Sequence, residues 1–202
     1  MGVAAASGVG AHPWLSLEEH AQICTFALDH GIEPAWTREM VRRLRLSPPP
    51  ERGDVPGWPW PIEIVTLGTL EILRQGEPIR PVKRTQRRPL HLLKHLVAAG
   101  QGRALAQDDV ADALWPDADG DAAQHALEMT VHRARKLLGA DHAIVVRDGA
   151  IALNARACRV DAWAFERVAR EALARAANGG RTGAAADLAR VLSLYALSLI
   201  HI

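Results

Sequence analysis

Side chains that can donate hydrogen bonds to a polyanion or to a base gather on one side of a predicted helix. The stretch "HALEMTVHRARKLLG" (125–139) has apolar residues at helical spacing, which form one stripe: Leu127, Val131, Ala134 and Leu138. At about 100° per residue, the opposite side carries His125, Met129, His132 and Lys136, with Glu128 and Arg133 at its edges. Donors, one thioether and little acid indicate a face that contacts another molecule.

The bulk composition excludes several classes of protein. The chain has 202 residues and a formal net charge of +1, so it has room for one large or two small domains, and its total charge indicates no partner. Cys24 and Cys158 stand far apart, which fits no disulfide framework and favours a reducing, cytoplasmic location. No apolar run is long enough to span a membrane, so we expect no membrane partner.

The first quarter of the chain predicts two helices and a linker. Residues 1–12 are small and apolar, and we expect them to be disordered. Residues 13–46 contain two helical stretches, "LSLEEHAQICTFALDHG" and "EPAWTREMVRRLRL". Ser16 and Glu19 form a capping box at the first, and Pro34 suits the first turn of the second. We expect this pair to end an upstream helical region. The proline-rich residues 47–60 predict a stiff linker.

The middle of the chain predicts strands, then three helices, then a hairpin. "IEIVTLG" and "TLEILRQGEPIRPV" have strand patterns, and "RQGEP" supplies a turn. Three helical stretches follow: "RTQRRPLHLLKHLVAAGQG", "LAQDDVADALWPD" and 122–138. "AIVVRDGAIALN" predicts a hairpin that turns at Asp148-Gly149. We assign this unit to residues 61–155.

The last part of the chain returns to helix. "VDAWAFERVAREALARAANGG" and "TGAAADLARVLSLY" predict an antiparallel pair, which we interpret as the truncated start of a helical-repeat domain over 156–195. Residues 196–202 end in "LSLIHI", which looks like translated sequencing-adapter DNA. We expect this tail to be non-native and the chain to be a fragment.

Charge alternates along the middle unit. Between positions 78 and 107 the charged residues are all basic: Arg80, Lys83, Arg84, Arg87, Arg88, Lys94 and Arg103. Between 104 and 130 they are all acidic: Asp108, Asp109, Asp112, Asp117, Asp119, Asp121 and Glu128. A compact helical bundle can place these sets on different surfaces. A basic surface would bind a polyanion with counterion release.

The order of these elements is that of a winged helix-turn-helix. The segments that carry the resemblance are "TLGTLEILRQGEPI", "RPLHLLKHLVAAG", "LAQDDVADALWPDADGDAAQHALEMTVHRARKLLG" and "VDAWAFERV". Together they resemble the response-regulator-type (OmpR-like) winged helix of bacterial transcriptional activator domain proteins, which include Streptomyces antibiotic regulatory proteins and large ATPase and helical-repeat regulators.

The resemblance implies an α+β fold and a DNA-binding function in transcription regulation and signal transduction. It implies an N-terminal four-stranded sheet, a recognition helix over 122–138, a C-terminal wing hairpin near 145–151 and flanking helical pairs, the second of them tetratricopeptide-like. The implied contacts to double-stranded DNA are His125, Met129, His132, Arg133, Lys136 and, at the wing, Arg147.

Weaker parts of the resemblance add further candidates. Arg87 and Arg88, near the start of the first helix, are secondary DNA contacts. The loop with Trp115, Asp117 and Asp119 matches the segment that touches RNA polymerase in this fold. Homodimers or tandem binding would also be compatible with the family. Glu128 would repel phosphate unless it reads the amino group of a cytosine.

Other chemistry finds little support in the sequence. His91 and His95 lie four residues apart, yet no third ligand or catalytic Glu accompanies them, so we predict no metal and no cofactor. Asp108, Asp109 and Asp112 suit a helix N-terminus rather than a carboxylate site. Trp58 and Trp60 are expected to be packed rather than to stack on bases.

We find no catalytic arrangement and expect a protein that is not an enzyme. The alternative to DNA binding is a protein–protein adaptor in a signalling complex, which would use the winged helix and the helical pair without binding DNA.

Overall fold

The computed structural model describes residues 14–49, 52, 55–79, 87–100, 102–177 and 189. The chain forms two compact units, residues 1–60 and 61–202. The stretch expected to be disordered (1–12), the second predicted helix of the C-terminal pair and the tail (196–202) lie outside the described residues, apart from Ala189 in that helix.

The first unit contains the two predicted helices, α2 (Leu17–Asp29) and α3 (Pro34–Leu44). The capping box is confirmed: the backbone N–H of Glu19 donates to the Ser16 hydroxyl over 3.2 Å, and the Ser16 backbone N–H donates to the Glu19 carboxylate over 2.8 Å. Pro34 begins α3 as predicted. The buried side chains between the helices include Ala21, Cys24 and Val41.

The segment expected to be a linker is packed. Val55, Trp58 and Trp60 are buried in the same small core as the two helices, and Leu46 joins them from the end of α3. Prolines prevent regular helices and strands, but they do not prevent the burial of nearby large apolar side chains, which is favourable. Val55, Trp58 and Trp60 therefore belong to the core of the first unit. Both tryptophans are packed, as predicted.

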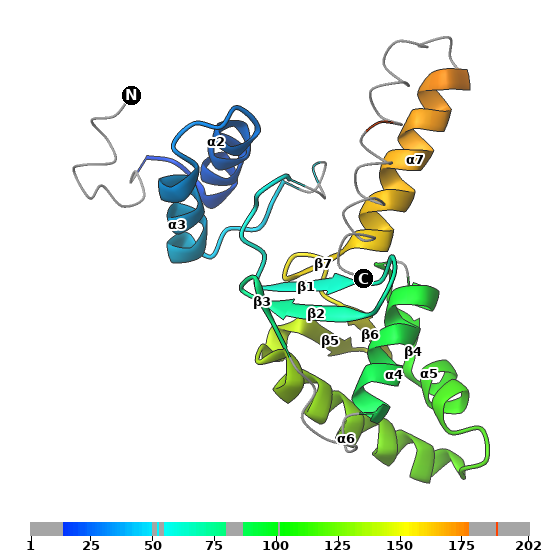
Figure 1. The fold of residues 1–202 in the computed structure, drawn as a ribbon. Helices are drawn as coiled ribbons and strands as arrows, with labels where there is room; N and C mark the ends of the chain where they lie inside the picture. The colour runs from blue at the N-terminus through cyan, green and yellow to red at the C-terminus, as the bar shows by residue number, and fades with distance from the viewer. Residues whose placement is uncertain are drawn as a thin grey trace. The chain divides into compact units, whose positions relative to one another are not determined.

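The second unit is built on a mixed sheet of four strands in the order β3-β2-β1-β7 (Figure 1). Its strands are β1 (Ile62–Val65), β2 (Glu71–Arg74), β3 (Glu77–Pro78) and β7 (Cys158–Val160). β1 pairs antiparallel with β2, opposing Ile64 to Ile72, and parallel with β7, opposing Ile64 to Val160. The predicted turn occupies Gln75 and Gly76, both at positive φ.

Three helices and a hairpin follow the first three strands. α4 (Arg87–His95) continues into a π-helical turn (Leu96–Gly100), and α5 (Gln107–Leu114) and α6 (Gly120–Leu138) come next. A short 3-10 turn (Asp141–Ala143) leads into β5 (Ile144–Arg147) and β6 (Ala150–Leu153). One apolar core joins the sheet, these helices and the hairpin. The fold class is α+β.

Three local features differ from the prediction. α6 begins at Gly120, two residues before the expected start at 122, because Asp119 caps it. β4 (Leu105–Ala106), expected as helix, pairs with β6, so the hairpin lies in a three-stranded sheet of order β4-β6-β5. The fourth strand of the main sheet is β7, which follows the hairpin. It extends the folded unit past residue 155, where we expected this unit to end.

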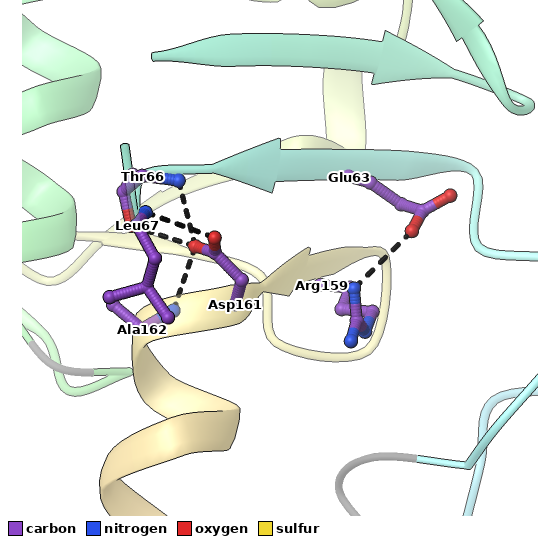
Figure 2. A network of polar contacts seen from close by, with 6 residues as sticks. All are labelled: Glu63, Thr66, Leu67, Arg159, Asp161 and Ala162. Carbon is purple, nitrogen blue, oxygen red and sulfur yellow. Dashed lines mark hydrogen bonds and ion pairs between the residues drawn. The ribbon is translucent and has the colours of Figure 1, made fainter. Parts of the chain in front are cut away.

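α7 (Asp161–Ala177) is the first helix of the C-terminal pair, and its first residue ties it to the sheet. The buried carboxylate of Asp161 accepts hydrogen bonds from the Thr66 backbone N–H at 2.8 Å, the Thr66 hydroxyl at 2.7 Å and the Leu67 N–H at 3.0 Å (Figure 2). Arg159 and Glu63 form an ion pair of 3.5 Å across β7 and β1, also drawn in Figure 2. Val160 in β7 and Asp161 in α7, the first residues of the segment "VDAWAFERV", therefore connect the main sheet, the loop after β1 and α7.

Candidate nucleic-acid interface

Local sequence fixes both ends of α6. The Gly120 N–H donates to the Asp119 carboxylate over 2.9 Å, and the Asp119 carbonyl accepts from the Ala123 N–H over 2.8 Å. The helix ends at Gly139, which adopts a left-handed φ of 67°. The left-handed backbone at Gly139 favours glycine, and a Cβ added there would also require the Arg74 guanidinium to move.

The helix divides into a buried side and an exposed side as the spacing predicts. Its buried residues are Ala123, Leu127, Thr130, Val131, Ala134 and Leu138. Its exposed side carries the five candidate contacts, which are His125, Met129, His132, Arg133 and Lys136. We refer to these five residues together with Glu128 as the outer face of α6. The structure therefore places the predicted helical contacts on one solvent-facing surface.

Glu128 and His125 are neighbours on this surface. The Glu128 carboxylate lies 3.9 Å from Nδ1 of His125, and the two side chains are 72% and 76% exposed. This pair is an ion pair only when the imidazole is protonated. At such exposure it contributes little to stability. The outer face thus contains one carboxylate among groups that donate hydrogen bonds.

Arg135 fixes the end of α6 to the hairpin. Its Nε and Nη2 both donate to the carbonyl oxygen of Ile144, over 3.1 and 2.7 Å. The Asn154 side-chain amide donates to the carbonyl of His142 over 3.0 Å at the same open end of the hairpin, opposite the turn. Arg135 is one of several basic residues near the end of α6, and its charge alone indicates no structural role. Its position beside the apolar stripe, rather than opposite it, was the available signal of a structural role.

The hairpin presents a cation near its turn. Arg147 is 83% exposed and lies 3.2 Å from the carboxylate of Asp148. Asp148 and Gly149 form the predicted turn, with φ of 51° and 72°, which is the conformation of a tight two-residue hairpin loop. Val145 and Val146 are partly exposed on β5, the edge strand. The hairpin therefore offers one arginine and an apolar strand to a neighbouring molecule.

Arg87 and Arg88 have different environments. Both are exposed, but Nη1 of Arg88 donates to the carbonyl of Leu114 over 2.6 Å, and its guanidinium lies 5.4 Å from the centroid of the Trp115 ring. Arg88 thereby provides a hydrogen-bond donor for the Leu114 carbonyl at the end of α5, and its guanidinium lies over the Trp115 ring in the following loop. Arg87 has no such contact within the described part of the chain.

The loop between α5 and α6 also contains residues with structural contacts and one residue without them. Trp115 is half-buried against the core, and Asp119 caps α6. Asp117 is exposed. The side-chain amide of Gln124 donates to the carboxylate of Asp108, which links the two helices beside the loop. Of the three predicted loop contacts, Asp117 alone is both exposed and without a structural contact in the described residues.

The described residues contain no group of three His, Cys, Asp or Glu side chains close enough to hold a metal ion. Burial raises the pKa of the Cys158 thiol to about 12 and also raises the pKa of Cys24. No helix in the described ranges is long and apolar enough to cross a membrane.

A known structure shares the fold. No family model and no curated sequence matches the chain. Mycobacterium tuberculosis EmbR, solved in complex with a low-affinity phosphopeptide, is similar at 19% identity and a TM-score of 0.50. The likeness covers 67% of this chain and 36% of the EmbR chain, so this chain matches about a third of that protein. At this identity the similarity shows the fold.

Proposed function

We propose that the second unit is a winged helix-turn-helix that binds double-stranded DNA as part of a transcriptional regulator. α5 and α6 would form the helix-turn-helix, with α6 in the major groove, and β5–β6 would form the wing. α7 would begin the tetratricopeptide-like helical domain. One observation carries the proposal: the outer face of α6 exposes five side chains suited to DNA, while the opposite face supplies the core.

The chemistry of the outer face matches the two kinds of contact that a DNA reader makes. Arg133 and Lys136 carry positive charge for phosphate oxygens or guanine, and His125 and His132 can donate to either phosphates or bases. The thioether of Met129 is suited to apolar contact in the groove, such as with a thymine methyl group. Arg147 would contact the adjacent backbone from the wing.

The rigid attachment of the wing supports this proposal. Phosphate contacts from a helix and a hairpin act together only if the two elements keep a fixed spacing. The two hydrogen bonds from Arg135 to Ile144, at 3.1 and 2.7 Å, hold that spacing. Arg87 would add a contact from the start of α4. Arg88 is a weaker candidate because it already binds Leu114.

We further assign the loop with Trp115, Asp117 and Asp119 to contact with RNA polymerase. Asp117 would make the contact, and Trp115 and Asp119 would hold the loop in place. On DNA, copies of the chain would bind as homodimers or in tandem on adjacent sites.

The salt dependence of DNA binding tests the function. With about three to six phosphate contacts, the slope of log affinity against log salt concentration should be roughly −3 to −5. The measurement uses the full chain and a labelled duplex library between low and moderate salt. A matched variant, Asp112→Asn, changes one charge on α5 outside the outer face and should keep the slope. A folded chain with flat or absent DNA binding would instead favour the adaptor function.

A further inference from the structure

Glu128 occupies an unusual position on a surface proposed to face a polyanion. It lies about 60° around the helix axis from His125, and its side chain is 72% exposed. Its one contact within the described residues is with His125, at 3.9 Å. The carboxylate therefore holds no part of the fold together, and it would lower the affinity for any phosphate beside it.

The major-groove edges of the four bases differ in what they offer a carboxylate. Guanine presents two acceptors, N7 and O6, and thymine presents the O4 acceptor, all of which repel a carboxylate. Adenine presents an amino donor beside the N7 acceptor. Cytosine presents the N4 amino donor and no acceptor. A carboxylate that reaches the bases consequently selects cytosine.

We infer that Glu128 is a specificity-determining residue that selects a cytosine at one position of the DNA target. This inference rests on the proposed function, and it identifies one base pair in the DNA sequence that the protein would recognise. His125 is placed to support it, since Nδ1 lies on the Glu128 side. A protonated imidazole donates from both ring nitrogens, so Nε2 of His125 can then donate to the guanine paired with that cytosine, or to a neighbouring base, while Nδ1 faces the Glu128 carboxylate. Together, the two side chains would read a C·G pair through opposite hydrogen-bonding roles.

Selection from a randomised duplex library with the full chain tests this inference. The wild type should enrich cytosine at one position, and replacing that C·G pair should weaken binding roughly 5- to 150-fold. Glu128→Ala should level the preference there and leave the rest of the motif unchanged. Glu128→Gln should move it toward adenine, because glutamine accepts from N6 and donates to N7.

Asp112→Asn is the matched control, since it removes one exposed negative charge from α5. It should retain the cytosine. Circular dichroism of each variant verifies folding, which an exposed site should preserve. If wild type binds DNA and Glu128→Ala keeps the same cytosine preference, the assignment of Glu128 is wrong and DNA binding stands. If the folded wild type enriches no duplex, the proposed function itself is wrong.

Discussion

The indole N–H of Trp163 donates a hydrogen bond to the carbonyl oxygen of Val97 over 2.9 Å. This bond joins the first turn of α7 to the π-helical turn that follows α4. A Cβ added at Gly102, whose φ is 80°, would lie in ordinary van der Waals contact with the same ring. α7 is therefore attached to the second unit at two points, Asp161 and Trp163.

Trp163→Phe removes the donor and keeps most of the apolar ring. We expect the free energy of unfolding to fall by about 0.5–1.5 kcal/mol, the usual net contribution of one such bond. Hydrogen exchange in the first turns of α7 should accelerate. The exposed Leu173, changed to alanine on the same helix, serves as control. Unchanged exchange in Trp163→Phe would show that the bond does not hold α7.

Asp161→Ala should be more damaging than Trp163→Phe. It leaves the N–H groups of Thr66 and Leu67 without their acceptor. Each partly buried donor that loses its hydrogen-bond partner costs about 1–3 kcal/mol of stability. Asp161→Asn retains one oxygen acceptor and should lose less. Chemical denaturation of the three proteins measures the order. Equal stability of wild type and Asp161→Ala would contradict the role assigned to this carboxylate.

Arg135→Lys should loosen the wing. A lysine has one point of donation and cannot reproduce the pair of bonds that Nε and Nη2 make to Ile144. We expect a loss of about 1–3 kcal/mol in unfolding free energy and weaker DNA binding with it. The exposed Arg133→Lys should leave stability unchanged. Nuclear magnetic resonance shifts of β5 amides report the wing directly, and their constancy in Arg135→Lys would refute the attachment.

The two sides of α6 should respond oppositely to truncation. Leu127→Ala removes a buried core side chain and should destabilise the protein by about 2–5 kcal/mol. Arg133→Ala and Lys136→Ala should leave stability within about 0.5 kcal/mol and weaken DNA binding. Thermal unfolding and a binding titration at fixed salt separate the two effects. The reverse pattern would mean that the exposed side is not the contact surface.

The capping box makes the stability of the first unit depend on pH. The Ser16 backbone N–H and then its hydroxyl lower the pKa of Glu19. Because this pKa is lower in the folded state, the stabilising effect is complete above the unfolded value, about 4.3, and is lost as pH falls through the folded pKa. Ser16→Ala keeps the backbone N–H and removes the hydroxyl, so it should raise the pKa of Glu19 in part and weaken this acid dependence. Carboxyl chemical-shift titration measures it, and an unmoved Glu19 pKa in the variant would contradict the cap.

Local sequence determined the elements that carry strong short-range signals. The capping box, Pro34, the turn at Asp148-Gly149 and the apolar stripe of α6 all depend on neighbours within a few residues. The spacing of that stripe also determined which side of α6 is exposed, because a helix period fixes both faces at once. The candidate contacts on α6 could therefore be selected from the sequence.

Tertiary structure decided the features whose partners lie far along the chain. β4 and β7 are two and three residues long, and pairing with β6 and β1 makes them strands where their own pattern does not. Arg88, Arg135 and Asp161 resemble surface charges in the sequence, yet each binds a backbone group outside its own helix. The partners of Trp58 and Trp60 in the core, on α2 and α3, likewise depend on how the chain folds back on itself. The type of a residue shows whether its side chain is charged or apolar. Which group that side chain binds or packs against is decided only when distant parts of the chain come together in the fold.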